Sequence, residues 1–382
     1  MLIRNGNVLT DTWQFEQLDL RIVGDTIDKT APAGSIQAKC DLRQEPVFDA
    51  QGLYVVPGLV DIHIHACAGY DFCDAREDSV RGMSRYLIKQ GVTSFVAASM
   101  AYDEERLKNV FEVGKKMVQS GIPGGAQLRG IHMEGPFFSK VKKGVQPEKY
   151  IIEPDIDMFD RLNSVSGGTI RLVDIAPELP RAMEFIRHAS TIATVSIAHT
   201  TADYTTAMEA FRSGATHVTH LFNAMPPFSH RDPGVVGAAS DAGADVELIC
   251  DGIHLHPSVI RSVFKWFGDD KVILISDAMM ACGLPDGTYE LGGQAVDVSA
   301  GKATLHDGTI AGSAADLYTC MKRAVEFGIP LESAVRAAAY NPARSAGLDQ
   351  QIGSIASGKR GDLLLLDTNL SIVQVICGGQ FC

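Results

Sequence analysis

The stretch VVPGLVDIHIH, residues 55–65, is an apolar run that ends in two histidines one residue apart. Successive side chains of a β-strand point to opposite faces, so His63 and His65 would share a face. Two imidazoles on one face could hold a metal ion, or they could be ordinary polar residues at a strand end. The rest of the chain has to decide between these two interpretations.

Seven further apolar runs follow, and helix-like segments separate them. The runs are TSFVAAS (93–99), LRGIHMEG (128–135), IRLVDIAPE (170–178), ATVSIAHT (193–200), THVTHLFN (216–223), DVELICDG (245–252) and KVILISDA (271–278). Near-continuous apolar strands that alternate with helices predict a parallel sheet, and eight such units predict an α/β fold of the (β/α)8 TIM-like barrel type. An open doubly wound sheet is the alternative, but no Gly-x-Gly-x-x-Gly follows an early strand.

The two ends of the chain have a different pattern. Residues 1–50 and 353–380 contain short apolar stretches broken by turn residues such as Asn-Gly and Gly-Asp, which predict short strands. We expect both ends to form one small β-sandwich domain. The expected division is 1–53 and 346–382 for this discontinuous domain, and 54–345 for the catalytic barrel.

Composition narrows the function classes. The chain has 382 residues and a net charge of −12, which argues against a nucleic-acid-binding surface. No run of about 18 apolar residues and no signal-peptide core is present, so neither a membrane span nor secretion is expected. The eight scattered cysteines include no C-x-x-C pair and fit reduced thiols, so we expect a cytoplasmic protein.

Polar residues lie where the predicted strands end, which is where a barrel of this kind carries its active site. They are His63, His65, Glu134, His199, His220, Asp251 with His254 just beyond, and Asp277. Buried imidazoles and carboxylates are costly unless they pair or hold a cation, so a metal is the simplest explanation. Such ligands suit zinc, iron or manganese.

A divalent ion with an open position lowers the pKa of bound water to near neutrality. A carboxylate beside it can take the proton of the water and return it to a leaving group. Asp277 follows the apolar run VILIS and is the candidate for this role. The predicted reaction is hydrolysis of an amide-like bond.

Motifs along the whole chain carry a family resemblance. Besides Pro57-Gly58 and His63-x-His65, they are HMEGPFF (132–138), KKG (142–144), SIAHT (196–200), THLFNAMPP (219–227), RDPG (231–234), DGIH (251–254), ISDAM (275–279) and GTIAGS (308–313). The chain resembles the amidohydrolase superfamily and, within it, the N-acetylglucosamine-6-phosphate deacetylase family.

The resemblance implies a role for each matching residue. Glu134, His199 and His220 match the principal metal ligands, and His63 and His65 match a second metal position bridged by Glu134. The implied cofactor is one or two divalent ions, zinc first, with iron, manganese or cobalt as alternatives. Asp277 matches a catalytic acid/base that also contacts the metal.

The implied substrate contacts match the remaining motifs. They are Gln146, Asn223, Ala224, Arg231, Asp251, His254 and Ile310-Ala311-Gly312. His254 is also expected to polarise the acetyl carbonyl, and Arg231 to come from the partner subunit of a homodimer. Gln146 departs from the family pattern, because some relatives have a histidine at this position.

The resemblance implies metal-dependent hydrolysis of N-acetylglucosamine 6-phosphate to glucosamine 6-phosphate and acetate, in amino-sugar catabolism or cell-wall recycling. The partner would be this small sugar phosphate, with no nucleic acid and no membrane. Two alternatives stay open. One is another amidohydrolase, a cyclic amidase or a deaminase, that ignores phosphate. The other is a non-catalytic barrel that serves as a binding module.

Overall fold

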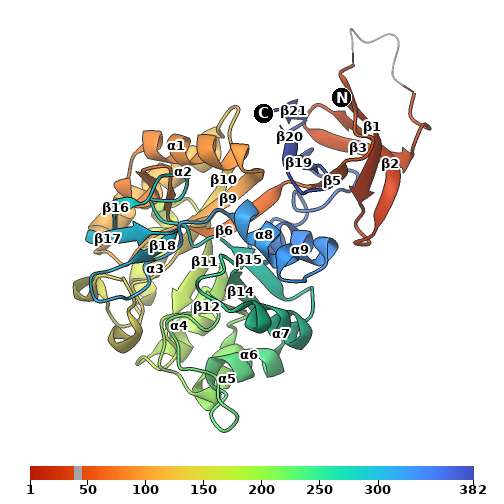
Figure 1. Cartoon of the computed structure of the whole chain (residues 1–382). Helices are drawn as coiled ribbons and strands as arrows, with labels where there is room; N and C mark the ends of the chain where they lie inside the picture. The colour runs from red at the N-terminus through yellow and green to blue at the C-terminus, as the bar shows by residue number, and fades with distance from the viewer. Residues whose placement is uncertain (38–44) are drawn as a thin grey trace.

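The computed structural model describes residues 1–37 and 45–382, and a barrel of eight parallel strands dominates it (Figure 1). The barrel strands are β6 (Leu59–Ile64), β9 (Val92–Ala98), β10 (Gln127–Met133), β11 (Ile170–Ile175), β12 (Thr194–Ile197), β13 (His217–Val218), β14 (Asp245–Ile249) and β15 (Val272–Ile275). A parallel bridge between Ile64 and Ala278 joins the first strand to the end of the last. All eight predicted strand runs are present, and the expected (β/α)8 barrel is confirmed.

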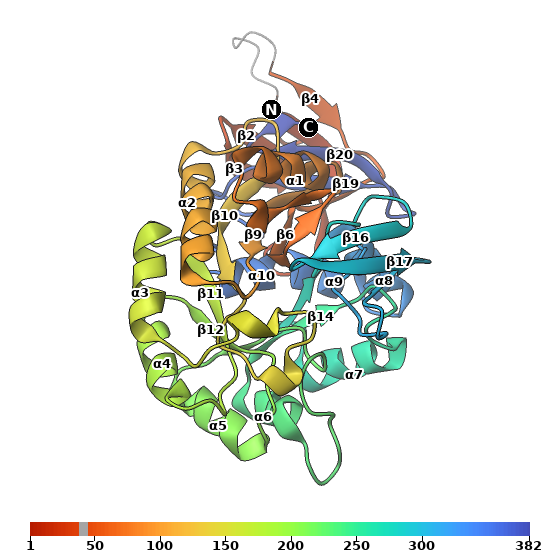
Figure 2. The ribbon, with the colours of Figure 1, turned by 90° about the vertical axis from the view of Figure 1, so that its left-hand side faces the viewer.

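Helices follow the strands and cover the outside of the barrel (Figure 2). They are α1 (Glu77–Lys89), α2 (Glu104–Ser120), α3 (Ile156–Val165), α4 (Ala182–Ala189), α5 (Tyr204–Ser213), α6 (Gly234–Ala242), α7 (Pro257–Phe267) and α8 (Leu317–Glu326). Aspartates at the N-termini of α2, α3, α5 and α8 accept a hydrogen bond from a backbone N–H of the first turn. Each helix buries its apolar side against the strands, which forms the main core.

Two further helices, α9 (Leu331–Ala338) and α10 (Tyr340–Ser345), follow α8. Helix α10 contacts the residues at which barrel strands begin. The Asn341 amide donates to the Val272 carbonyl (2.7 Å), and the Thr194 hydroxyl donates to the Ser345 carbonyl (2.6 Å). These contacts cover the N-terminal end of the barrel, so the opposite end, where the strands finish, is the one available for a site.

The two ends of the chain form a small β domain with its own core. Its strands are β1 (Leu2–Leu9), β2 (Phe15–Val23), β3 (Thr26–Pro32), β4 (Val47–Asp49), β5 (Tyr54–Pro57), β19 (Leu363–Leu366), β20 (Ile372–Cys377) and β21 (Gln380–Phe381). Strand β19 pairs with β5, which joins the C-terminal segment to the N-terminal one. The small β domain expected from both ends is therefore confirmed.

The chain passes from the small domain to the barrel at Pro57–Gly58. Strand β5 ends at Pro57 within the small domain, and β6 begins the barrel at Leu59. A Cβ atom on Gly58 would lie 2.3 Å from the Thr93 hydroxyl oxygen, so the side chain of Thr93 occupies the space that any other residue would need.

A three-stranded antiparallel sheet lies between β15 and α8. It consists of β16 (Gly287–Leu291), β17 (Gln294–Ser299) and β18 (Lys302–Thr304), and it projects beside the barrel mouth (Figure 2). The sequence analysis did not predict this sheet. The remaining short elements are β7 (Ala66–Cys67), β8 (Tyr70–Asp71), and the 3-10 turns Phe72–Asp74, Lys140–Lys142 and Glu148–Tyr150.

Two expectations concern the chain as a whole. Among the described residues, every helix is too short or too polar to cross a bilayer. The cysteines in the described ranges all carry free thiols, whereas Cys40 lies outside the residues that the structure describes.

Candidate active site

The six side chains predicted as metal ligands meet at the C-terminal end of the barrel. They come from the ends of five strands: His63 and His65 (β6), Glu134 (β10), His199 (β12), His220 (β13) and Asp277 (β15). All six are buried. Strands that tilt around a barrel bring their ends to one rim, and this is why residues more than 200 positions apart in sequence lie together.

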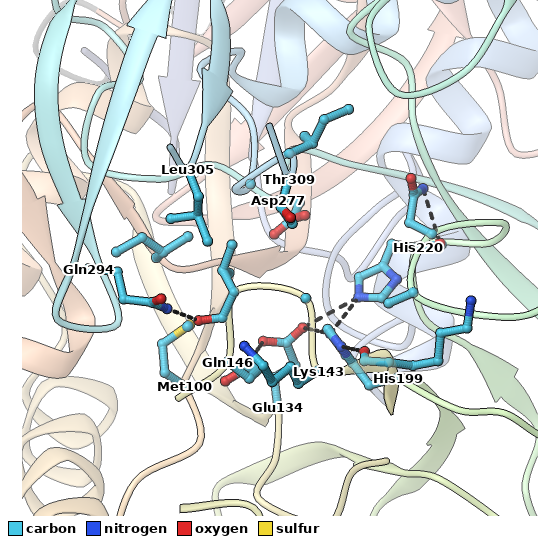
Figure 3. Close-up of a pocket in the computed structure, with 18 of the residues that line it drawn as sticks. Met100, Glu134, Lys143, Gln146, His199, His220, Asp277, Gln294, Leu305 and Thr309 are labelled. Carbon is cyan, nitrogen blue, oxygen red and sulfur yellow. Dashed lines mark hydrogen bonds and ion pairs between the residues drawn. The ribbon is translucent and has the colours of Figure 1, made fainter. Parts of the chain in front are cut away.

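Glu134 lies at the centre of this group (Figure 3). Its Oε1 atom is 3.3 Å from His199 Nε2, 3.4 Å from His220 Nε2 and 3.5 Å from His63 Nε2. Its Oε2 atom is 3.4 Å from His65 Nε2. One carboxylate thus faces two pairs of imidazoles.

The residues fit one or two divalent cations. Nε2 of His63 is buried without a hydrogen-bond partner, and it lies 3.5 Å from Glu134 Oε1 and 3.6 Å from Asp277 Oδ1. Two groups of three ligand atoms share Glu134: His63 with His65, and His199 with His220. Imidazole nitrogens and carboxylate oxygens are ligands that zinc, iron, manganese and cobalt accept.

The charges of the group also favour a cation. Burial alone would raise the pKa of Glu134, but the facing imidazoles, His65 first, outweigh burial and hold that pKa well below its usual range. Burial likewise opposes ionisation of Asp277, and the hydrogen bond from His65 and the charge of His63 lower its pKa. Both carboxylates are therefore ionised although they are buried.

The backbone at three of these residues is in the left-handed region. The φ angles are +44° at His199, +32° at His220 and +47° at Asp277, each just past a strand end. A non-glycine residue in such a conformation costs on the order of 1–3 kcal/mol and persists where the surroundings impose it. This turn points each side chain back over the barrel mouth.

A cavity of about 590 Å³ opens above the group. Of the predicted substrate contacts, the cavity is lined by Gln146, Asn223, Ala224, His254, Ile310 and Gly312. Asp277 also lines it, and its side chain is 13 % exposed, whereas the His63 side chain is completely buried. Glu134 lines the cavity as well, but its side chain is only 3 % exposed, so Asp277 is the more accessible of the two carboxylates.

Three predicted substrate contacts lie elsewhere. Asp251 is buried and does not line the cavity, whereas His254 does. Oδ2 of Asp251 accepts a hydrogen bond from His254 Nδ1 (2.7 Å), so Asp251 contacts the imidazole from behind. Ala311 is fully buried, and its N–H donates to the Ala303 carbonyl (3.1 Å), so only its neighbours face the cavity. Arg231 is exposed on the segment between β13 and α6, outside the cavity wall of its own chain.

Comparisons with known proteins agree with this geometry. The sequence model of the amidohydrolase family matches residues 54–382. The chain belongs to the amidohydrolase family. It is 38% identical over 331 residues to the N-acetylglucosamine-6-phosphate deacetylase of Bacillus subtilis (strain 168). The aligned region covers 85% of this chain and 84% of that protein.

Two further relatives cover almost the whole of this amidohydrolase. The N-acetylgalactosamine-6-phosphate deacetylase of Escherichia coli O157:H7 is 34% identical over 99% of this chain and 98% of its own. A mutant N-acetyl-D-glucosamine-6-phosphate deacetylase from Mycobacterium smegmatis, solved in complex with N-acetyl-D-glucosamine-6-phosphate, superposes with a TM-score of 0.92. It is 33% identical and covers 100% of this chain and 98% of its own.

The sequence analysis missed Glu247, a fully buried residue of β14. Its Oε2 accepts hydrogen bonds from His63 Nδ1 (3.0 Å) and from the backbone N–H of His220 (3.1 Å). A carboxylate on the outer nitrogen fixes the tautomer that turns Nε2 toward a metal. The available signal was a carboxylate inside the apolar strand DVELI.

Two other histidines of the barrel interior have polar partners of their own. Both ring nitrogens of His132 are hydrogen-bonded, one to the Ile62 carbonyl (3.0 Å) and the other to Asp174 (2.8 Å). His217 contacts the Ser345 hydroxyl (2.8 Å) and lies 3.2 Å from Glu247. They stabilise the barrel interior beneath the ligand group, by which we mean the six predicted metal ligands His63, His65, Glu134, His199, His220 and Asp277.

The sequence analysis also left three lysines without a role. Lys140, Lys142 and Lys143 line the cavity, on the loop that follows β10. Figure 3 labels Lys143 among them. The carbonyl of Lys142 accepts a hydrogen bond from His199 Nδ1 (2.8 Å), so this loop is joined directly to the ligand group. The lysines give the cavity a cationic edge that suits an anionic group.

Proposed function

We propose that this amidohydrolase removes the N-acetyl group of N-acetylglucosamine 6-phosphate, giving glucosamine 6-phosphate and acetate. The observation that carries the proposal is Asp277, whose carboxylate lines the cavity and lies 3.4 Å from His65 Nε2 and 3.6 Å from His63 Nε2. A proton acceptor beside a cation site is what amide hydrolysis requires. Relatives at 33–38% identity that are named for this reaction support the choice of substrate.

The proposed cofactor is a divalent metal, zinc first, with iron, manganese or cobalt as alternatives. Two ions would share Glu134, one held with His63 and His65 and the other with His199 and His220. When bound, such an ion activates a water molecule and polarises a carbonyl oxygen. Glu247 and the Lys142 carbonyl would keep the ligand rings in place.

In the proposed mechanism Asp277 moves the proton. Its carboxylate accepts a proton as the water oxygen bonds to the acetyl carbon, and it returns this proton to the nitrogen as the C–N bond breaks. His254, whose Nδ1 is held by Asp251, presents Nε2 to the substrate and would polarise the acetyl carbonyl. Asn223, Ala224, Ile310 and Gly312 would contact the sugar.

The phosphate would lie among positive groups. Lys140, Lys142 and Lys143 are available within one chain. Arg231 is exposed and does not line its own cavity, which supports a homodimer in which it reaches the partner's cavity. A cytoplasmic enzyme of amino-sugar catabolism or cell-wall recycling follows from this substrate.

A second candidate substrate is N-acetylgalactosamine 6-phosphate. The Escherichia coli relative that carries this activity in its name covers 98% of its own length in the match. The two sugars differ in the direction of one ring hydroxyl, so the same metal chemistry would serve both.

The test is acetate release from both sugar phosphates by the purified protein, before and after chelation. We expect chelation to abolish turnover, because the proposed mechanism needs a bound metal ion to activate water. Adding back zinc, iron, manganese or cobalt should restore turnover. Faster release from the galactosamine compound would favour the second substrate. Full activity of metal-depleted protein would contradict the proposal.

A further inference from the structure

Gln146 is a cavity-wall residue whose amide is already engaged. The residue is 1 % exposed, its Oε1 accepts a hydrogen bond from the backbone N–H of Ala101 (2.7 Å), and its Nε2 donates to Glu134 Oε2. A backbone N–H can only donate, so it must face the amide oxygen. This fixes the NH2 group on Glu134, where Figure 3 shows it.

The bond acts on one particular oxygen of Glu134. Oε2 is the oxygen that faces His65 (3.4 Å), whereas Oε1 faces His199 and His220 and also lies 3.5 Å from His63 Nε2. The terminal torsion of a glutamate is soft, so without a partner the carboxylate could turn both oxygens toward one side. With Nε2 of Gln146 on Oε2, this oxygen stays directed to His65 while Oε1 stays directed to His199 and His220.

We propose that Gln146 is a positioning residue that holds Glu134 as a bridge and so secures the ion bound by His63 and His65. The proposal rests on the proposed function, which places two ions around Glu134. It differs from the role expected from the sequence, in which Gln146 contacts the sugar. The geometry gives its amide a partner on the ligand carboxylate instead.

The neutral charge of glutamine suits this role. A cationic donor at this point would compete with the metal for the same oxygen, since two like charges a few ångströms apart in a buried site repel strongly. The amide donates without adding charge and does not titrate.

The experiment compares variants of the full chain by titrating metal-free protein with zinc in the absence of substrate. Gln146→Met keeps the length of the side chain and removes both hydrogen bonds. Gln146→Asn keeps an amide that is one methylene too short to span Ala101 and Glu134 at once. The control is Gln294→Met, since Gln294 also lines the cavity but donates to the Val145 carbonyl (2.5 Å) rather than to Glu134.

We expect wild type and Gln294→Met to bind two ions per chain. Both Gln146 variants should keep one ion at wild-type affinity and bind the other about 10–100-fold more weakly, as for losses of partners of metal ligands. With two Mn²⁺ ions, wild type should give an exchange-coupled EPR signal that the Gln146 variants lose. A general structural defect would weaken binding of both ions and would not abolish the coupled signal alone.

Other outcomes overturn the proposal. If either Gln146 variant binds both ions as wild type does and only raises KM, Gln146 is a substrate contact. If saturated wild type binds one ion, there is no bridge to hold. Acetate release is measured in parallel: wild type that binds two ions but releases no acetate would contradict the proposed function and leave the role of Gln146 standing.

Discussion

Asp277 combines three features at one residue: the end of a buried strand, contact with His63 and His65, and a carboxylate that reaches the cavity. Asp277→Asn keeps the shape of the side chain, and asparagine tolerates the positive φ better than most residues. We expect the variant to fold and to bind metal. Its kcat for acetate release should fall by about 10²–10⁴-fold, because the amide cannot accept the proton. A kcat near that of wild type would remove Asp277 from this role.

Glu247 lets the contribution of an outer partner be measured. Glu247→Gln keeps the volume and loses the negative charge that orients His63 through Nδ1. We expect zinc affinity to fall by about 10–100-fold, measured by titration of metal-free protein with a competing chelator.

The matched control for Glu247 is a carboxylate–histidine pair on the surface. Asp160 of α3 lies 2.7 Å from Nε2 of the half-buried His188 of α4, and both helices lie outside the barrel strands. Asp160→Asn should leave zinc affinity unchanged. Equal affinities of Glu247→Gln and wild type would show that the His63 ring is held by other contacts.

At the scale of single residues, the sequence predicted which side chains form the site better than it predicted the hydrogen bonds between them. Alternation along a strand and the position of strand ends are local properties, so Glu134 and the five residues that meet around it could be found from the sequence. The bond from Gln146 to Glu134 and that from His63 to Glu247 join distant segments. Such pairings depend on how the barrel closes, and no local pattern predicts them.

Among the elements, the sheet β16–β18 has a role that can be tested at one hydrogen bond. Leu291 and Gln294 at its β16–β17 turn line the cavity, and Gln294 Nε2 donates to the Val145 carbonyl on the opposite loop. Gln294→Ala removes this link. We expect KM for the sugar phosphate to rise by up to about tenfold, the value of one hydrogen bond, with kcat and metal content unchanged.

Steady-state kinetics and metal analysis of Gln294→Ala check this prediction together. An unchanged KM would show that the contact between the sheet and the loop plays no part in binding. A loss of metal would mean that the sheet supports the ligand group itself.

The barrel strands could be predicted because both of their faces are buried, which leaves short continuous apolar runs between helices. Strand β13 is shorter than its run, since the chain turns at His220 with φ of +32°. The sheet β16–β18 was missed because half of its residues are exposed and it lies outside the strand–helix rhythm. Helix α10 was missed as well, because its six residues are too few to show a helical pattern in the sequence.

For the whole molecule, the proposed homodimer predicts how mixed subunits behave. Arg231→Ala and Asp277→Asn should each be nearly inactive, one through loss of the phosphate contact and the other through loss of proton transfer. If Arg231 serves the partner's cavity, a mixed dimer has one site with both residues intact. Equal mixing after dissociation should then restore about a quarter of wild-type activity.

Acetate release by the mixture, with the mass of the particle measured by light scattering, is the readout. Mixtures no more active than their components would show that Arg231 acts in its own chain or not at all.

The β domain built from both ends of the chain was predictable because its strands carry local turn signals. A subunit contact has no such signal in a single sequence.

The most direct test of the account is acetate release from N-acetylglucosamine 6-phosphate beside the unphosphorylated sugar. The lysine edge, His254 and Arg231 predict rapid release from the phosphate and little or none from the free sugar. Equal release from both would contradict the anion site. Release from neither by protein shown to contain metal would contradict the proposed substrate and leave only the amidohydrolase site.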